Sequence, residues 1–573
     1  MTAMTYDAAA AHLVQTNPAF ATTRATIRGT SYTVFANSPP TLRDMLHRSR
    51  ALHLDGEDDY LIYQSERLSY DAFCDEVCMM ARALQSRGIV PGDRVAVAMR
   101  NYPELLILFL ATASIGAVIV FVNAWWTEEE LDYALRDSGA RMVFADGPRM
   151  QRLLPLKDRL GLTLIGVRDG AEIAPEAFDT VRKTGAGAGW PDVHIDTDDD
   201  FAIMYSSGTT GHPKGVVLTH RGAVNAVYTW LMQSAMYPLM QEDEPDPDPP
   251  TPVILVATPL FHVTATHPVF LYSIPAGARI VLMYKWDAAE AVRLIRDEKV
   301  TRLLGVPTQT ADLMECAARM GEPLDSLKFL GSGGAKRPAA QVGQLTQAFP
   351  NALVATGWGM TETNAIGIGM AGADYVSRPG TAGKLYPPVQ ELRFLDEAGQ
   401  DVAPGEVGEI TVKSPCNMRQ YLNKPEATAE VLKDGWLRTG DLGCIDDAGF
   451  VTIVDRAKNI IIRGGENIAC LDVENALHHH PAVAEACAFP VPDARLGETV
   501  GALVQIRTGM AAEVAELQAF LRAHIAHFKI PEHVWMQGDP LPRGATDKLD
   551  RRGIRALCSD LLQKGDPQDA GHV

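Results

Sequence analysis

One run in the middle of the chain, residues 205–220, places hydroxyl groups, glycines and a lysine between two apolar segments. Hydroxyl and backbone N–H groups donate hydrogen bonds to phosphate oxygens, glycine lets the backbone approach an anion closely, and lysine adds a charge. The run therefore predicts a phosphate-binding turn, made by Ser206, Ser207, Gly208, Thr209, Thr210, Gly211, Lys214 and Gly215. Its spacing is not that of the Walker P-loop, but a nucleotide is the ligand we expect. The alternative is a surface loop without a ligand.

Four further motifs come after the phosphate-binding run in a fixed order. They are Gly357-Trp-Gly-Met-Thr-Glu362, Thr439-Gly-Asp441, Asp455-Arg-Ala-Lys458 and the segment 541–549, which contains Lys548. Together with the run they resemble the signatures of the adenylate-forming (ANL) superfamily, which includes acyl-CoA synthetases, carrier-loading adenylation domains and beetle luciferases. The resemblance covers about Leu42 to Leu562, and several ordered motifs are far more specific than one. It also implies a role for individual residues of each motif.

The first of these motifs resembles the segment that holds adenine, phosphate and metal. The resemblance implies that Trp358, where the family usually has tyrosine, stacks on adenine, with Gly357 and Gly359 beside it in the cofactor-binding segment. It also implies that Thr361 contacts the α-phosphate and that Glu362 helps to hold Mg²⁺. A flat indole suits a purine face, and a carboxylate is the oxygen ligand that magnesium prefers.

The other motifs resemble the ribose, hinge and lysine segments of the family. The resemblance implies that Asp441 binds the ribose hydroxyls, that Arg456 reaches the ribose and phosphates, and that Lys458 is the hinge of a mobile lid. It makes Lys548 the catalytic lysine, whose ammonium group would neutralise charge as a carboxylate displaces pyrophosphate. The alternative for the segment from Asp455 to Lys458 is an exposed charged turn.

Two more segments correspond to the acyl and thiol sites of the family. His262 matches a gate of the acyl pocket, and the turn that contains Gly333 and Gly334 matches its wall and the adjoining cofactor site. The loop around Gly464 and Gly465 matches the one that lines the path of the CoA pantetheine arm, where glycines let the arm pass close to the backbone.

The chain also departs from the family at two places. Asp547 stands before the catalytic lysine where glycine is usual, so the local positive field could be weaker. Ala469-Cys-Leu471 replaces the usual aromatic residue and proline after the CoA loop, whereas Glu474 matches. The details of CoA contacts therefore do not transfer from the family to this chain.

The elements that must position these residues alternate between strands and helices. This alternation predicts an α/β fold with a large N-terminal domain of parallel β/α subdomains. Short alternating strands after Gly380 predict a small β-rich subdomain, and a compact α+β segment comes after Lys458. We therefore expect an AMP-binding domain at 1–457, with the acid, ATP and Mg²⁺ sites, and a lid domain at 458–573. We expect residues up to about Pro40 to be irregular and 167–195 to be a linker.

Bulk composition favours a small-molecule enzyme. A chain of 573 residues needs two or more cores, and a formal net charge of -19 disfavours nucleic acid and acidic membrane surfaces. The eight cysteines show no paired zinc-ligand spacing, which favours a reducing, cytoplasmic location. Three consecutive histidines at 478–480 cannot all face one ion on a helix. We read the apolar run 105–122 as a buried helix and strand rather than a membrane span, and expect no secretory signal.

The predicted function is that of an acid–thiol ligase with ATP, Mg²⁺ and CoA. The substrate we expect first is a medium- or long-chain fatty acid, and next an aryl-alkanoic or steroid side-chain acid. One alternative hands the acyl group to a carrier protein, and another is a non-catalytic nucleotide-binding scaffold, which Asp547 keeps open. Luciferase-like oxidation has no support beyond the superfamily. The sequence leaves open whether the chain forms a homodimer.

Overall fold

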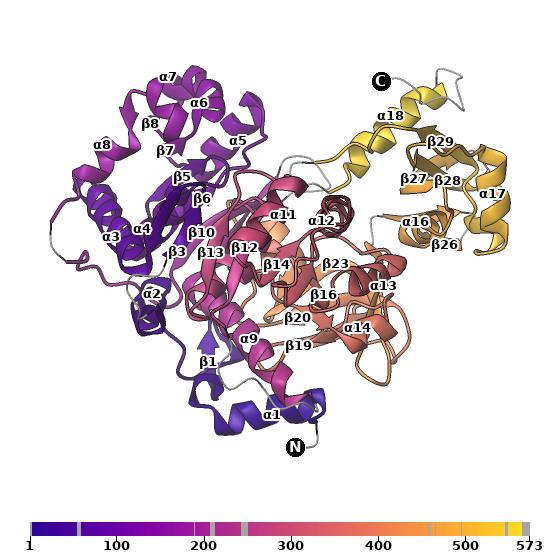
Figure 1. The fold of residues 1–573 in the computed structure, drawn as a ribbon, viewed down its shortest axis with the longest axis horizontal. Coiled ribbons are helices and arrows are strands. Elements are labelled where there is room, and N and C mark those ends of the chain that lie inside the picture. Colours follow the sequence, from indigo (N-terminus) through magenta and orange to yellow (C-terminus); the bar gives the residue numbers. More distant parts are fainter. Residues whose placement is uncertain are drawn as a thin grey trace.

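The computed structural model describes residues 3–53, 59–187, 189–206, 213–241, 250–456, 459–463, 466–493, 495–544 and 548–563. Within them the strands form two large sheets, two five-stranded sheets and one N-terminal hairpin. Figure 1 shows the two large sheets side by side in the indigo-to-orange part of the chain, with the yellow C-terminal part set to one side. The α/β fold class is confirmed.

The first large sheet has the strand order β21-β11-β10-β6-β5-β7-β8-β9. Its strands are β5 Arg94–Ala98, β6 Val118–Phe121, β7 Met142–Ala145, β8 Thr163–Gly166, β9 Glu176–Ala177, β10 Asp200–Ser206, β11 Lys214–Thr219 and β21 Gln420–Tyr421. The six neighbouring strands β10, β6, β5, β7, β8 and β9 are parallel, whereas β10 and β11 form an antiparallel pair. Helices α3 Tyr70–Ser86, α4 Pro103–Ser114, α5 Glu128–Ser138, α6 Gly147–Leu153 and α7 Lys157–Leu160 lie in the same part of the chain.

Helix α4 and strand β6 account for the apolar run at 105–122. Every residue from Leu105 to Ser114 is buried, so this helix is apolar because protein surrounds it on all sides. None of the helices in the described ranges is both long and apolar enough to cross a membrane.

The second large sheet has the order β18-β17-β16-β15-β14-β12-β13-β3-β4. Its strands are β3 Asp59–Tyr63, β4 Glu66–Ser69, β12 Val253–Val256, β13 Arg279–Leu282, β14 Arg302–Gly305, β15 Phe329–Ser332, β16 Leu353–Trp358, β17 Ile368–Ala371 and β18 Lys384–Leu385. The run from β3 to β16 is parallel, and antiparallel strands close both edges. The helices of this half are α9 His220–Leu239, α10 Val263–Ala265, α11 Ala288–Asp297, α12 Pro307–Met320, α13 Ala339–Ala348 and α14 Ala373–Ser377.

A small antiparallel sheet comes next, as the short strands after residue 380 predict. It contains β19 Glu391–Leu395, β20 Gly408–Lys413, β22 Leu432–Lys433, β23 Trp436–Ile445 and β24 Val451–Arg456, with α15 Pro425–Val431 before β22. The pairing of β23 with β24 places Asp441 opposite Arg456.

The C-terminal part, which we call the lid, has its own sheet and core. Its strands are β25 Ile460–Arg463, β26 Glu466–Ala469, β27 Val483–Asp493, β28 Gly497–Ile506 and β29 His533–Gln537, and its helices are α16 Cys470–His478, α17 Val514–Arg522 and α18 Arg551–Gln563. Two apolar clusters draw only on residues 461–562. The expected boundary at 457/458 lies outside the described residues and stays a prediction.

Two expectations about irregular segments are wrong. The stretch before Pro40 forms α1 Tyr6–Thr16 and the hairpin of β1 Thr22–Ile27 with β2 Thr30–Phe35, and helix α2 Leu42–Arg48 comes after it. Strand β1 is largely exposed, so no apolar alternation reveals it in the sequence. The expected linker at 167–195 contains β9 and α8 Phe178–Lys183, whose Phe178 and Val181 are buried.

Candidate active site

One part of the predicted site lies where neighbouring parallel strands end. In the register of the parallel strands β14, β15 and β16, Gly305 lies beside Ser332 and Ser332 lies beside Thr356. The backbone N–H of Gly333 donates to the carbonyl of Gly305 over 3.0 Å, which ties the turn after β15 to the end of β14. The carboxyl ends of parallel strands are the usual place for ligands in α/β sheets.

Glycine is required at two of these turns. Gly334 has φ +78°, and a Cβ there would lie 2.9 Å from Cε of Lys548. At Gly359 a Cβ would lie 2.2 Å from the carbonyl oxygen of Ala365, which is closer than any real contact. Around Gly357, by contrast, the nearest such atom is 3.8 Å away, so the backbone there leaves open space.

Trp358, Asp441 and Arg456 form a connected polar group. The indole Nε1–H of Trp358 donates to Oδ2 of Asp441 over 2.7 Å, and Nε of Arg456 lies 3.2 Å from Oδ1. Asp441 is 7% exposed, whereas more than half of the Arg456 side chain is exposed. The Trp358 ring packs over Gly367, where a Cβ would lie 2.8 Å from the ring. The ribose-binding carboxylate that the sequence predicts is therefore held from two sides.

Glu362 lies in the short turn 361–363, after Thr361, and is 6% exposed. The Tyr421 hydroxyl donates to its Oε1 over 2.9 Å, and Nζ of Lys214 lies 4.6 Å from the centre of the Tyr421 ring. Burial raises the pKa of Glu362, and the positive charges of Arg456 and Lys214 oppose that shift. Tyr421, on a two-residue strand at a sheet edge, is a neighbour that no sequence motif reveals.

The residues around Glu362 suit a metal that is shared with a substrate. Among the described residues Glu362 forms no ion pair, and no three histidine, cysteine or acidic side chains come together as a metal cage. Magnesium typically binds one or two carboxylates together with phosphate oxygens. Glu362 therefore fits a magnesium ion bound to the phosphates of a nucleotide.

Lys548 reaches this group from the lid. Its side chain lies against Gly334, and its charge interacts with those of Arg456, Asp441 and Glu362. Burial, and secondarily Arg456, lowers the pKa of Lys548 to about 8. A turn holds the lysine in place, because the N–H of Gly544 donates to the Lys548 carbonyl over 2.7 Å.

His262 lies near enough to Lys548 for their charges to interact. Burial, and secondarily Lys548, lowers the pKa of His262 to about 3, so the imidazole is neutral at neutral pH. His262 comes directly before α10, in the loop that leaves β12. A neutral ring beside the lysine is compatible with the predicted acyl-pocket gate, which stays a prediction.

The phosphate-binding run is seen only at its ends. Ser206 ends β10 and Lys214 begins β11, and the two residues face each other in the antiparallel pair. The predicted residues Ser207, Gly208, Thr209, Thr210, Gly211, Lys458, Gly464 and Gly465, and the departure Asp547, lie outside the described residues. The β10–β11 pair therefore brings the two ends of the run together, as a tight phosphate-binding turn requires.

A buried layer behind Glu362 was not predicted. Asn364 and Ala365 both have positive φ values, 51° and 63°, which are costly for residues with a side chain. Asn364 donates to the carbonyl of Cys416 over 2.6 Å, and its Oδ1 accepts from Nε2 of the buried His267 over 2.9 Å. These bonds hold the strained turn that presents Glu362. Nothing in a sequence motif indicates a left-handed asparagine.

Known proteins match this chain in two consecutive segments. The AMP-binding enzyme family matches residues 47–422, and the AMP-binding enzyme C-terminal domain matches residues 472–548. This chain belongs to the AMP-binding enzyme family. The enzyme is 31% identical to a long-chain-fatty-acid–CoA ligase of Bacillus subtilis, over 90% of this chain and 94% of that one. It is 34% identical to a feruloyl-CoA synthase of Amycolatopsis, over 85% and 93%.

Solved structures agree with the fold of this AMP-binding enzyme. The o-succinylbenzoate-CoA synthetase of Bacillus subtilis, in complex with its acyl-adenylate intermediate, has a TM-score of 0.75 and 27% identity, covering 89% of this chain and 97% of that one. ATP-bound MatB from Rhodopseudomonas palustris has a TM-score of 0.79 and 27% identity, covering 91% and 99%. The enzyme is thus an AMP-forming acid–thiol ligase, which uses ATP, Mg²⁺ and CoA.

Proposed function

We propose that this AMP-binding enzyme converts a medium- or long-chain fatty acid to its acyl-CoA. A carboxylate oxygen attacks the α-phosphorus of ATP, the bond to the bridging oxygen breaks, and pyrophosphate leaves. The CoA thiolate then attacks the acyl carbonyl carbon, and AMP leaves with the electron pair of the broken carbon–oxygen bond. The long-chain-fatty-acid–CoA ligase of Bacillus subtilis, matched over nearly its whole length, supports this choice of acid.

The proposed roles depend on where each side chain lies. Asp441, held by Trp358 and Arg456, accepts hydrogen bonds from the ribose hydroxyls, and the indole ring offers a face to adenine. Thr361 donates to the α-phosphate beside the turn. Glu362 binds the magnesium ion, which supplies positive charge to the phosphates.

The observation that carries the proposal is the position of Lys548. Its ammonium group lies against Gly334 at the end of β15 and interacts with Glu362 and Asp441, although it comes from the lid. A cation at this point stabilises the negative charge that develops as pyrophosphate leaves. In the second step, the lid turns about Lys458 and the loop with Gly464 and Gly465 lines the path of the thiol.

A second candidate substrate is an aryl-alkanoic or steroid side-chain acid. Support comes from the feruloyl-CoA synthase, at 34% identity, and from a Mycobacterium tuberculosis ligase for a methyl-dioxo-octahydroindenyl propanoate, at 32% over 87% of this chain. Transfer to a carrier protein and a purely nucleotide-binding role are less supported, because the matched relatives are CoA ligases.

We also propose a cytoplasmic location, on the basis of the scattered cysteines.

The test is a panel of acids, with AMP release as the readout. Wild-type enzyme is incubated with ATP, Mg²⁺ and CoA and either a chain-length series of fatty acids, ferulate or a steroid side-chain acid. We expect the highest kcat/KM with a medium- or long-chain fatty acid. A higher value with ferulate or the steroid acid would assign the enzyme to the second class. Thioester formed only on a purified holo-carrier protein, or no ATP–pyrophosphate exchange with any acid, would contradict the proposal.

A further inference from the structure

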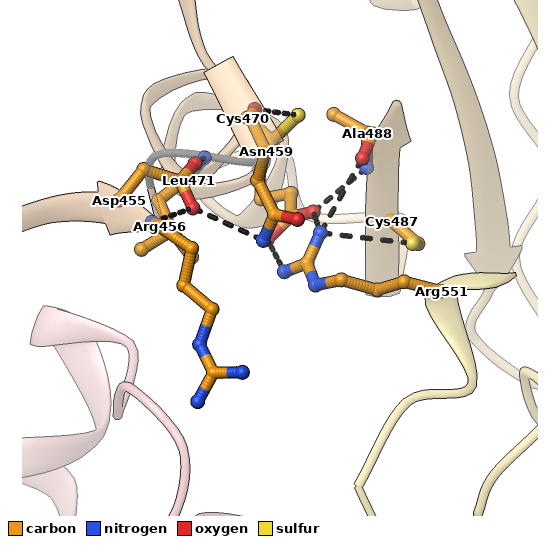
Figure 2. A network of polar contacts seen from close by, with 9 residues as sticks. Asp455, Arg456, Asn459, Cys470, Leu471, Cys487, Ala488 and Arg551 are labelled. Carbon is orange, nitrogen blue, oxygen red and sulfur yellow. Dashed lines mark hydrogen bonds and ion pairs between the residues drawn. The ribbon is translucent and has the colours of Figure 1, made fainter. Parts of the chain in front are cut away.

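A polar contact region joins the lid to the large domain, and we call it the lid seam. It consists of Lys336, Asp455, Asn459, Leu471 and Asp472 (Figure 2 labels three of them). Asp455 belongs to β24 and Lys336 to the loop after β15, whereas the other three belong to the lid. The seam therefore joins residues on both sides of position 458, where the hinge is proposed.

Asp455 is the centre of the seam. The residue is 2% exposed, and its Oδ2 accepts from the backbone N–H of Leu471 over 3.0 Å. Oδ1 accepts from Nδ2 of Asn459 over 3.2 Å and from the N–H of Arg456 over 2.7 Å. Leu471 lies in the first turn of α16, and Ala469 at the N-cap offers no side-chain acceptor. A carboxylate from the large domain thus caps a helix of the lid.

Helix α16 connects the contact at Asp455 with the segment that carries Lys548. Glu474 of α16 forms a two-bond ion pair with Arg551, at 2.5 and 2.6 Å, and accepts from the N–H of Ala488 over 2.7 Å. Figure 2 shows the Arg551 guanidinium directed toward Ala488 and Cys487, and Arg551 also donates to the Ala488 carbonyl over 3.3 Å. Because Arg551 comes three residues after Lys548, a fixed α16 also fixes the base of the lysine segment.

Lys336 supports the seam from the nucleotide side. It comes two residues after Gly334, which touches Lys548, and its Nζ donates to the carbonyl of Ile453 over 3.4 Å. Burial lowers the pKa of Lys336, and the negative charges of Asp472, Asp455 and Glu474 oppose the shift. The lysine is therefore attracted to the lid in this orientation.

The rest of the junction is not closely packed. A cavity of about 240 Å³ lies between the domains, lined on one side by Lys336 and the start of α13 and on the other by Asn475 and His478 of α16 and by His479 directly after it. One water occupies about 30 Å³ of liquid, so this space holds several. The polar contacts of the seam therefore lie beside an open space between the two domains.

We propose that Asp455, assisted by Lys336, is a positioning residue that holds the lid in the orientation that places Lys548 in the site. The bond from Asp455 to Leu471 must then break when the lid turns for thioester formation. This inference rests on the proposed two-step function and on the proposed hinge. It assigns the residues of the seam to one half-reaction only.

The test separates the two half-reactions in the full-length enzyme. Adenylate formation is followed by ATP–pyrophosphate exchange, and thioester formation is followed by adding purified acyl-adenylate and CoA. We expect Asp455→Ala to slow exchange about tenfold or more, because it removes bonds to a charged group, and to change thioester formation less than threefold. Asp455→Asn keeps an acceptor for Leu471 and recovers part of the loss. Asp447→Ala, on an exposed turn before β24, is the matched control.

Lys336→Met gives an independent arm with Lys328→Met, an exposed lysine of the same domain, as control. We expect exchange to fall about threefold to tenfold and thioester formation to stay within twofold. Equal slowing of both half-reactions in Asp455→Ala and Lys336→Met would overturn the proposal, because it would indicate a general structural role. Unchanged exchange in both variants would overturn it as well.

A readout without catalysis separates this inference from the proposed function. Limited trypsin digestion after Arg456 is compared in Asp455→Ala, Asp447→Ala and wild type, with thermal melting as the fold control. We expect Asp455→Ala to be cleaved at least threefold faster at an unchanged Tm. Equal cleavage rates would contradict the seam even in an active enzyme, whereas absent exchange in wild type with faster cleavage in Asp455→Ala would contradict only the proposed function.

Discussion

In the large domain Asp441 and Glu362 are held by bonds to neighbouring side chains, whereas Lys548 reaches the same site from a lid that makes polar contacts beside a cavity. Asp441 is bonded to Trp358 and Arg456 within the small sheet and its neighbour. Glu362 is bonded to Tyr421 and supported by a strained, hydrogen-bonded turn. The lid is bonded to Asp455 through the N–H of Leu471, and a cavity lies beside this contact.

This difference indicates how one site serves two reactions. In the proposed function Asp441 and Glu362 act in both steps, and their bonds within the large domain fix them before ATP arrives. Lys548 is proposed to act only while pyrophosphate leaves, after which the lid would move it away and free its place for a thiol. Substitutions in the two domains should therefore have different effects. A substitution in the large domain should alter the binding of ATP, and a substitution in the lid should alter the rate of one half-reaction.

Replacement of Lys548 by alanine gives the largest expected effect. Loss of a charge that acts on the transition state predicts a fall of about 100-fold to 1000-fold in ATP–pyrophosphate exchange. Thioester formation from supplied acyl-adenylate stays within about threefold, because the lysine is proposed to be absent from that step. Arg555→Ala, an exposed cation of α18, is the control and keeps normal exchange. A wild-type rate of ATP–pyrophosphate exchange in Lys548→Ala would show that the lid supplies no group to adenylate formation.

The pH dependence of adenylate formation gives the next largest effect. The charged lysine is the active form, and its pKa is lowered to about 8, so neutral lysine accumulates as pH rises through that value. We expect kcat/KM for ATP, which reports the free enzyme, to be level below pH 8 and to fall about tenfold per pH unit well above it.

Lys548→Arg provides the control for this profile. The guanidinium of arginine stays charged in this range, so its alkaline limb moves above about pH 10 even if the rate is lower at every pH. The same alkaline limb in wild type and Lys548→Arg would show that a group other than Lys548 titrates. The lowered pKa of Lys548 would then not account for the pH dependence of adenylate formation.

Gly334→Ala tests the contact between the two sides directly. The residue has φ +78°, and an added Cβ would lie 2.9 Å from Cε of Lys548, so the lysine must shift. We expect exchange to fall about tenfold, with KM for ATP changing less than kcat. Gly321→Ala, at φ +70° with open space around it, controls for backbone strain alone. Equal effects of the two substitutions would attribute the loss to strain and not to the position of Lys548.

The sequence predicts candidate site residues, whereas the contacts that hold them come from the structure alone. Ordered motifs at strand ends indicated that Gly333 and Trp358 belong to one site, because parallel strands bring their carboxyl ends together. Asp441 lies within the antiparallel strand β23, and only the family resemblance indicated that it belongs with them. The bond from Tyr421 to Glu362 depends on a two-residue edge strand, and that strand has no signal in the chain.

The same limit applies to the lid seam. From the sequence, the segment from Asp455 to Lys458 is either a family hinge or a charged turn. Neither reading predicts that the Asp455 carboxylate caps α16, because this cap is a hydrogen bond between two domains. Side-chain bonds between distant segments depend on how the domains dock, and local composition does not encode them. Elements with exposed faces, such as β1, are missed for a related reason, because burial is what produces a visible pattern.

Trp358→Phe gives the smallest expected effect and tests the large-domain side alone. Phenylalanine keeps an aromatic face for adenine but removes the indole N–H that bonds to Asp441 over 2.7 Å. We expect KM for ATP to rise about twofold to tenfold, the usual range for one hydrogen bond, with kcat nearly unchanged. Trp436→Phe, on the same strand as Asp441, is the matched control.

A fall in kcat without a change in KM would contradict this assignment, because a group fixed before ATP binds stabilises bound ATP and the transition state equally, which changes KM and leaves kcat unchanged. An unchanged KM would instead show that Arg456 alone suffices to hold Asp441, whose Oδ1 it contacts at 3.2 Å. In that case Arg456→Met in the Trp358→Phe background should raise KM by more than the two single changes combined. A purely additive result would mean that the two partners hold the carboxylate independently.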